Sequence, residues 1–126
     1  MKTNYKVAIA LVAGAAIGGA AIQGLHAQPK PKAYQVIESE VLDASVVAAY
    51  NPTIQAAQTA AGGRSFRTTG RIVTDVGIAP ERVSITEWDS LEQVRAWENS
   101  AAGKNLKLQQ DKAIKIIRQY IVESAR

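Results

Sequence analysis

Cysteine is missing from the chain of 126 residues, and histidine occurs only once. The absence of cysteine excludes disulfides, thiolate metal ligands, cysteine nucleophiles and a lipid anchor attached through a thiol. The one histidine, His26, lies in the N-terminal segment. We therefore expect neither imidazole acid–base chemistry nor a histidine-ligated metal in the folded part. The sequence also has no phosphate-binding loop, nucleophile elbow or repeat, and no metal-ligand spacing, so we expect no metal site.

Positive charge is in small excess: the formal net charge is +4. Two lysines at the N-terminus, Lys2 and Lys6, supply part of it, and the remaining charges are dispersed. A nucleic-acid-binding surface needs a basic face or stripe, so we expect no nucleic-acid partner. The N-terminal segment has no twin-arginine pair. Its absence favours export of an unfolded chain, and hence a domain that carries no cofactor.

The N-terminal segment has the pattern of an export signal. Two lysines precede a long uncharged run rich in alanine and glycine, which ends at polar Gln28. We predict a signal peptide over residues 1–27, a proline-rich linker over 28–32 and a single domain over 33–124. Cleavage would leave the protein periplasmic or secreted. The apolar run also approaches the roughly 20 residues that a membrane helix needs. An uncleaved anchor in the inner membrane, facing the periplasm, therefore remains the alternative, and only then is a membrane a partner.

The domain is organised around residues 82–99. Apolar and polar residues alternate over 82–88, which predicts a strand with two different faces. Ser90 and Gln93 then fit a capping box, in which each side chain accepts a hydrogen bond from the backbone N–H of the other residue. The helix that follows has one apolar stripe, made of Leu91, Val94 and Trp97.

The other elements follow from the same periodicities and from turn residues. We predict strands over 33–41, 65–74 (bent near Gly70) and 116–123, and helices over 44–61 and 104–112, with a break at 100–103. Asp43 caps the first helix, Asn51-Pro52 kinks or restarts it, and Gly62-Gly63 ends it. The order βαββαβ predicts an α+β, ferredoxin-like fold: an antiparallel sheet with both helices on one face.

The first strand has a dry face that contains Ile37 and a more polar face that contains Tyr34 and Glu38. We expect the helices to cover the dry face. Two carboxylates on the second face indicate contact with water, or with a partner that supplies arginines.

Several segments resemble the bacterial family catalogued as domain of unknown function 1330. They are VLDAS, AGGRSF, TEWDSLEQVRAWENS and YIVE, and the resemblance extends from Lys32 to Ser124. The family looks like a branch of the dimeric α/β-barrel superfamily, whose two sheets pack face to face. The resemblance thus implies a homodimer in which Tyr34 and Glu38 meet a second copy. That superfamily includes cofactor-free monooxygenases, small isomerases and haem-handling proteins, so the fold alone leaves the function open.

The best candidate cluster for chemistry contains six residues: Tyr34, Glu38, Arg64, Glu87, Trp97 and Asn99. Glu87 is the candidate general base, and Arg64 is a candidate anchor for an anionic substrate. Alternatively, an Arg64–Glu87 ion pair simply fixes the sheet or the dimer. Trp97 and Trp88 either line a pocket for a planar ligand or pack in the core.

Three functions remain open at this point. The first is the binding of a small, partly apolar molecule in a cleft between helices and sheet. The second is an enzyme of the monooxygenase or isomerase type, without a cofactor and with a carboxylate base. The third is a structural or interaction module.

Overall fold

The computed structural model describes residues 29–66 and 70–125. The predicted signal peptide or anchor lies outside these residues. Within them, no helix has the length and hydropathy needed to cross a membrane.

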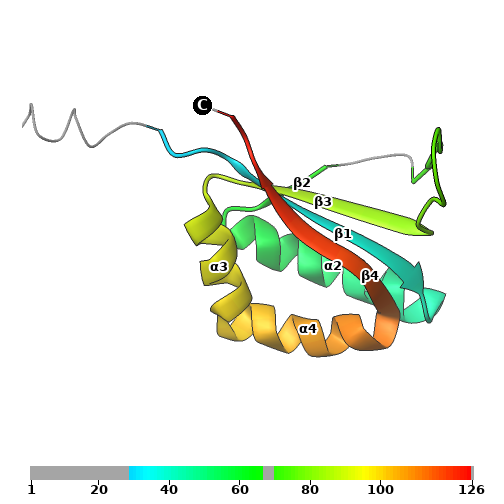
Figure 1. The fold of residues 1–126 in the computed structure, drawn as a ribbon. Coiled ribbons are helices and arrows are strands. Elements are labelled where there is room, and N and C mark those ends of the chain that lie inside the picture. The colour runs from blue at the N-terminus through cyan, green and yellow to red at the C-terminus, as the bar shows by residue number, and fades with distance from the viewer. Residues whose placement is uncertain (1–28, 67–69, 126) are drawn as a thin grey trace, which may run out of the picture. The chain divides into compact units, whose positions relative to one another are not determined.

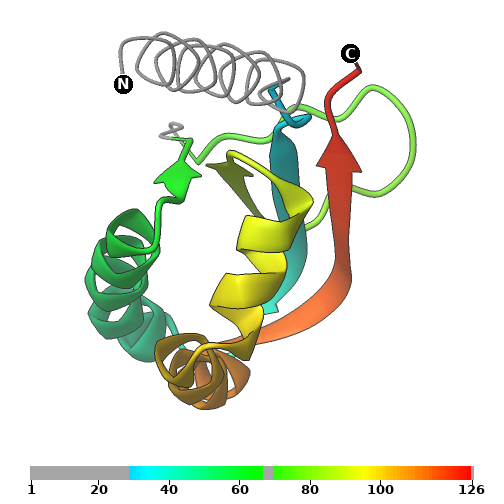
Figure 2. The same ribbon diagram turned by 90° about the vertical axis from the view of Figure 1, so that its left-hand side faces the viewer.

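The domain has two layers, with a sheet on one side and three helices on the other (Figures 1 and 2). Its elements are β1 (Ala33–Val41), α2 (Ala44–Ala60), β2 (Arg64–Ser65), β3 (Arg82–Trp88), α3 (Leu91–Asn99), α4 (Ala101–Ala113) and β4 (Ile114–Glu123). The sheet order is β2-β3-β1-β4, and every neighbouring pair is antiparallel. This arrangement confirms the predicted α+β, ferredoxin-like fold.

The local signals at the helix starts are confirmed. The Asp43 carboxylate accepts the backbone N–H groups of Ser45 and Val46. The Ser90 hydroxyl accepts the Gln93 N–H at 3.2 Å. The Gln93 side chain accepts from the backbone of Asp89, one residue earlier than a capping box requires.

The double glycine ends α2 for two separate reasons. Gly62 has φ 97°, in the left-handed region that favours glycine. At Gly63, a Cβ atom would lie 2.8 Å from the Trp88 ring. The first glycine therefore stops the helix, and the second lets β2 approach the core.

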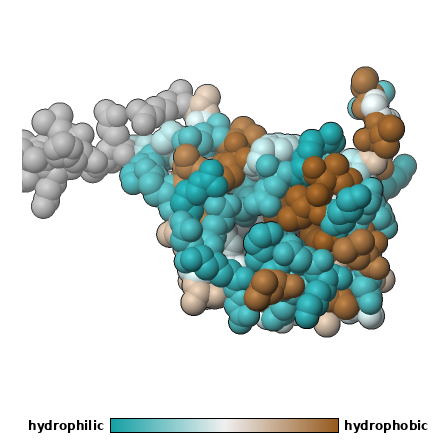
Figure 3. All heavy atoms as spheres, turned by 60° about the horizontal axis from the view of Figure 1, so that its bottom comes forward, coloured by the Kyte–Doolittle hydropathy of each residue, from teal (hydrophilic) through white to brown (hydrophobic). Residues whose placement is uncertain are grey.

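Two predictions about the first half of the domain were wrong in part. Of the strand expected over 65–74, only Arg64–Ser65 is strand in the described residues, and the Phe66 N–H donates to the Ile85 C=O. Residues 67–69 of that prediction lie outside the described residues. Residues 70–81 form an exposed loop without strand structure, whose apolar tip stands clear of the body (Figure 3). The helix α2 is continuous through Pro52, so no restart occurs at Asn51.

The expected break at 100–103 is a single residue. The Ser100 hydroxyl donates to the Trp97 carbonyl at 2.6 Å and accepts the Gly103 N–H at 3.0 Å. The same side chain therefore serves the end of α3 and the start of α4. As a result α4 begins at Ala101 and runs directly into β4 at Ile114, two residues before the predicted strand start.

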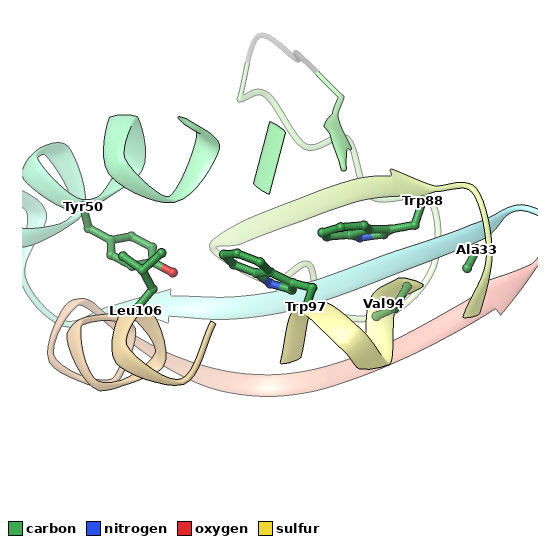
Figure 4. Packing of buried hydrophobic residues seen from close by; sticks show 6 residues of the cluster. All are labelled: Ala33, Tyr50, Trp88, Val94, Trp97 and Leu106. Atoms are coloured by element: carbon green, nitrogen blue, oxygen red, sulfur yellow. The ribbon is translucent and has the colours of Figure 1, made fainter. Parts of the chain in front are cut away.

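The core lies between the layers and contains Ala33, Tyr50, Trp88, Val94, Trp97 and Leu106. The rings of Trp88 and Trp97 stack with their centroids 6.1 Å apart (Figure 4). Both tryptophans are therefore core residues. Because β1 has its odd-numbered residues from Ala33 to Ser39 buried, the predicted dry face is confirmed.

Candidate functional site

The sheet face away from the helices, here called the open face, contains four of the six candidate residues. Strand register aligns Arg64, Glu87 and Tyr34 in one row across β2, β3 and β1. Glu38 lies on the same face of β1, four residues from Tyr34, since side chains alternate along a strand. The structure therefore brings these four predicted residues together on one face.

Glu87 is held by two cations. Its Oε1 atom accepts from Lys32 Nζ at 2.7 Å and from Arg64 Nη2 at 2.7 Å, and Arg64 also contacts Asp89 at 2.7 Å. The Glu87 side chain is only 17% exposed. Hydrogen bonds from Lys32 and then from Arg64 hold the pKa of Glu87 below its ordinary value. This carboxylate is a stabilised anion, and a lowered pKa makes it a weaker base.

Glu38 has a similar environment. The Arg118 guanidinium on β4 donates two hydrogen bonds to the Glu38 carboxylate, from Nε to Oε2 at 2.8 Å and from Nη2 to Oε1 at 2.6 Å. The Glu38 side chain is 11% exposed, and the hydrogen bonds from Arg118 hold its pKa below the ordinary value. The arginine that the polar face required is thus supplied from within the same chain.

Stability should fall when the pH drops below about 4.5, the ordinary pKa of both carboxyls. Above it, Glu38 and Glu87 are ionised in both states and contribute fully. Below it, the unfolded chain binds protons first, and the contribution disappears as the pH passes through the lower folded-state values. The double variant Glu38→Gln/Glu87→Gln should therefore lose less thermal stability than wild type between pH 5 and pH 3. Circular dichroism melts measure this.

A suitable control is Glu123→Gln, at the exposed end of β4, which should keep the wild-type pH profile. Parallel profiles for wild type and the double variant would mean that the two ion pairs do not stabilise the folded state.

The other two candidate residues lie elsewhere. Trp97 is on α3, under the opposite face of the sheet, where it stacks on Trp88. Asn99 is exposed at the end of α3. The sheet therefore separates both residues from Glu87. The general-base role of Glu87 and the ligand-binding roles of the other five remain predictions.

A cleft of about 980 Å³, here called the α2–β3 cleft, lies between helix α2 and strand β3. Among the described residues, β2 pairs with β3 only at Glu87 and Thr86, so the cleft lies beside the part of β3 that precedes this pairing. Its lining includes Ile37, Tyr50, Ile54, Gln58, Arg82 and Ile85. A smaller hollow of about 220 Å³ under α3 and α4 shares the first four of these and adds Trp97.

The polar groups of the α2–β3 cleft were missed by the sequence prediction. Gln58 is buried and lines both the cleft and the smaller hollow. Burial raises the pKa of Tyr50 to about 12, with the Arg82 charge opposing the shift. Tyr50 therefore stays a neutral hydrogen-bond donor at physiological pH. The available signal was the parity of β3, which places Arg82 on the helix side with Thr86.

Metal chemistry finds no support in the described part of the chain. No group of three His, Cys, Asp or Glu residues there has the geometry to hold a metal ion. What the cleft offers instead is a partly apolar wall with a few hydrogen-bond donors and three arginines, Arg64, Arg71 and Arg82.

Comparison with known proteins gives a family and a fold. A family model described as a domain of unknown function (DUF1330) matches residues 32–125. The fold is similar to that of a protein of unknown function from Rhodopseudomonas palustris, a structural genomics target. The two share 12% identity at a TM-score of 0.64, over 86% of this chain and 93% of the other. That likeness concerns the fold alone. No curated protein matches the chain.

Proposed function

The chain belongs to the DUF1330 family, a domain of unknown function, and we propose that it binds a small, partly apolar molecule in the α2–β3 cleft. One observation carries this proposal: a cleft of about 980 Å³ between α2 and β3 whose lining mixes isoleucines with polar and charged side chains. Small-molecule sites are typically clefts of roughly 300–1,000 Å³, mostly apolar, with a few polar groups that orient the ligand.

The lining supports a bound ligand more than a closed core. Ile37 and Ile54 supply apolar surface from the sheet and from α2. Gln58, which is 8% exposed, lines both the α2–β3 cleft and the smaller hollow, so its amide can hydrogen-bond to a ligand with a matching polar group.

Binding without turnover fits the observations better than the monooxygenase or isomerase alternative. That alternative relies on Glu87, which lies on the open face and is paired with Lys32 and Arg64. In the smaller hollow, the carboxylate of Glu98 accepts hydrogen bonds from Gln35 and Arg95. Both carboxylates are thus already paired with donors.

Our proposal includes a homodimer built on the open face. Tyr34 and Phe66 stack there at 6.2 Å, and Tyr120 and Val122 are about half exposed. Apolar side chains of this kind, interspersed with satisfied ion pairs, fit the face-to-face packing of two sheets. A module whose purpose is this contact alone would have no use for the cleft.

Export through the segment over residues 1–27 is the remaining part of the proposal. Its support is the sequence pattern of two lysines, an uncharged run and a polar boundary at Gln28.

Native mass spectrometry of the protein from the periplasmic fraction of its host tests these points together. We expect a dimer of chains that begin at Gln28, carrying additional mass from a ligand. The variant Ile54→Trp fills the cleft and should lose that mass, whereas Leu108→Trp on the exposed side of α4 should keep it. Additional mass that persists in Ile54→Trp would place the ligand elsewhere and contradict the proposal.

A further inference from the structure

Arg82 differs from the other arginines whose contacts are described. Arg64, Arg95 and Arg118 each form an ion pair with a carboxylate at 2.6–2.8 Å. The Arg82 guanidinium instead donates from Nη2 to the Asn51 side-chain oxygen at 2.8 Å, and no described carboxylate pairs with it. Since Arg82 is half-buried in the cleft lining, a full positive charge there lacks a counterion.

The nearest acid in the sequence does not neutralise this charge. Glu81 lines the same cleft, but its Oε2 atom accepts the backbone N–H of Val41 at 3.0 Å. A guanidinium has five N–H donors, and Asn51 uses one of them. Leaving a partly buried charge without a partner is costly, so the site favours an occupant that brings a negative charge.

The groups around Arg82 define the rest of such an occupant. Asn51 follows Tyr50 on α2, so one turn of that helix places the Tyr50 hydroxyl and the Asn51–Arg82 contact in the same cleft. Tyr50 stays protonated and can donate a second hydrogen bond. Ile37 and Ile54 continue the lining and suit an apolar body.

We propose that the ligand of the α2–β3 cleft is a small carboxylic acid with an apolar body, whose carboxylate binds the Arg82 guanidinium while its body lies against Ile37 and Ile54. This inference rests on the proposed function and specifies its ligand class. The planar fork of a guanidinium matches the two oxygens of a carboxylate. A phosphate dianion would call for more positive charge. Of the two other arginines in the lining, Arg64 is already neutralised by Glu87 and Asp89, and Arg71 is exposed on the loop.

A matched pair of probes tests the charge. The acid 4-phenylbutanoate and its neutral amide, 4-phenylbutanamide, have the same body and differ in the anion. Titration of the ¹⁵N-labelled protein, followed by chemical shifts of backbone amides around Tyr50, Ile54 and Arg82, gives both affinity and place. We expect the acid to bind at least about tenfold more tightly than the amide, as a charged hydrogen bond in a cleft predicts.

The variant Arg82→Gln should abolish this preference by weakening the acid to the level of the amide. Arg82→Lys keeps the charge and should keep most of the preference, which also controls for disturbed folding. Lys104→Gln removes one exposed positive charge outside the cleft and should change nothing.

Two results would overturn the inference, and they differ in reach. If acid and amide bind equally in the cleft, and Arg82→Gln has no effect, the carboxylate class is wrong while small-molecule binding stands. If neither probe shifts the cleft residues at millimolar concentration, both the ligand class and the proposed function fail for ligands of this size.

Discussion

Replacing Trp88 with alanine is expected to lower the free energy of unfolding by about 3–5 kcal/mol, the range typical of large-to-small substitutions of a buried aromatic. The Trp88 side chain is 0% exposed and stacks on Trp97 at 6.1 Å. Its ring also lies against Gly63, where an added Cβ atom would be 2.8 Å away. Its removal would therefore open a cavity at the junction of β3, α3 and β2. Urea denaturation followed by circular dichroism measures the change.

The variant Trp88→Phe separates loss of volume from loss of the indole nitrogen. Buried Trp88 Nε1 has no hydrogen-bond partner among the described residues, so its N–H contributes no stabilising hydrogen bond. We expect Trp88→Phe to cost less than half as much as Trp88→Ala. Equal costs for the two variants would show that the N–H has a partner, and a cost under 1 kcal/mol for alanine would show that the site is not packed.

The unit from β3 to α3 could be predicted because its signals are local. The alternation over 82–88 and the Ser90–Gln93 contact depend on residues within a few positions of one another. The same holds for Asp43 at the start of α2. Boundaries that depend on distant partners were wrong. The described part of β2 is defined by its pairing with β3, and the residues over 65–74 carry no information about that distant partner.

Part of the candidate site could be predicted from the sequence, for a related reason. Parity along a strand decides which side chains share a sheet face, so Tyr34 and Glu38 could be placed together. Parity along one strand does not give the register between strands, which is what places Glu87 beside Tyr34 on the face away from the helices. Trp97 was therefore grouped with Glu87, although the sheet separates them. Arg82 was overlooked because its role depends on what it lacks, a carboxylate partner, and a missing contact leaves no pattern in a sequence.

Introducing a charge at Tyr120 is expected to dissociate the proposed dimer. Tyr120 lies in the middle row of the open face, where β4 pairs with Val36 of β1 and Val36 pairs with Ile85 of β3. It is 45% exposed in the single chain, so a second sheet packed on this face would bury it. The variant Tyr120→Glu would then place an unpaired carboxylate in an apolar contact, at a cost of several kcal/mol. We expect the dissociation constant to rise at least about a hundredfold.

Sedimentation velocity over a series of protein concentrations measures this, with circular dichroism to verify that the variant is folded. The matched control is Leu108→Glu, which introduces the same charge at a side chain that is 66% exposed on α4, in the helical layer. It should leave the dimer intact, because the helices lie on the other side of the sheet. A wild-type protein that sediments as a monomer at micromolar concentration would contradict the dimer outright. Dissociation by Leu108→Glu but not by Tyr120→Glu would instead move the contact to the helices, and the open face would then have to be explained by its two ion pairs alone.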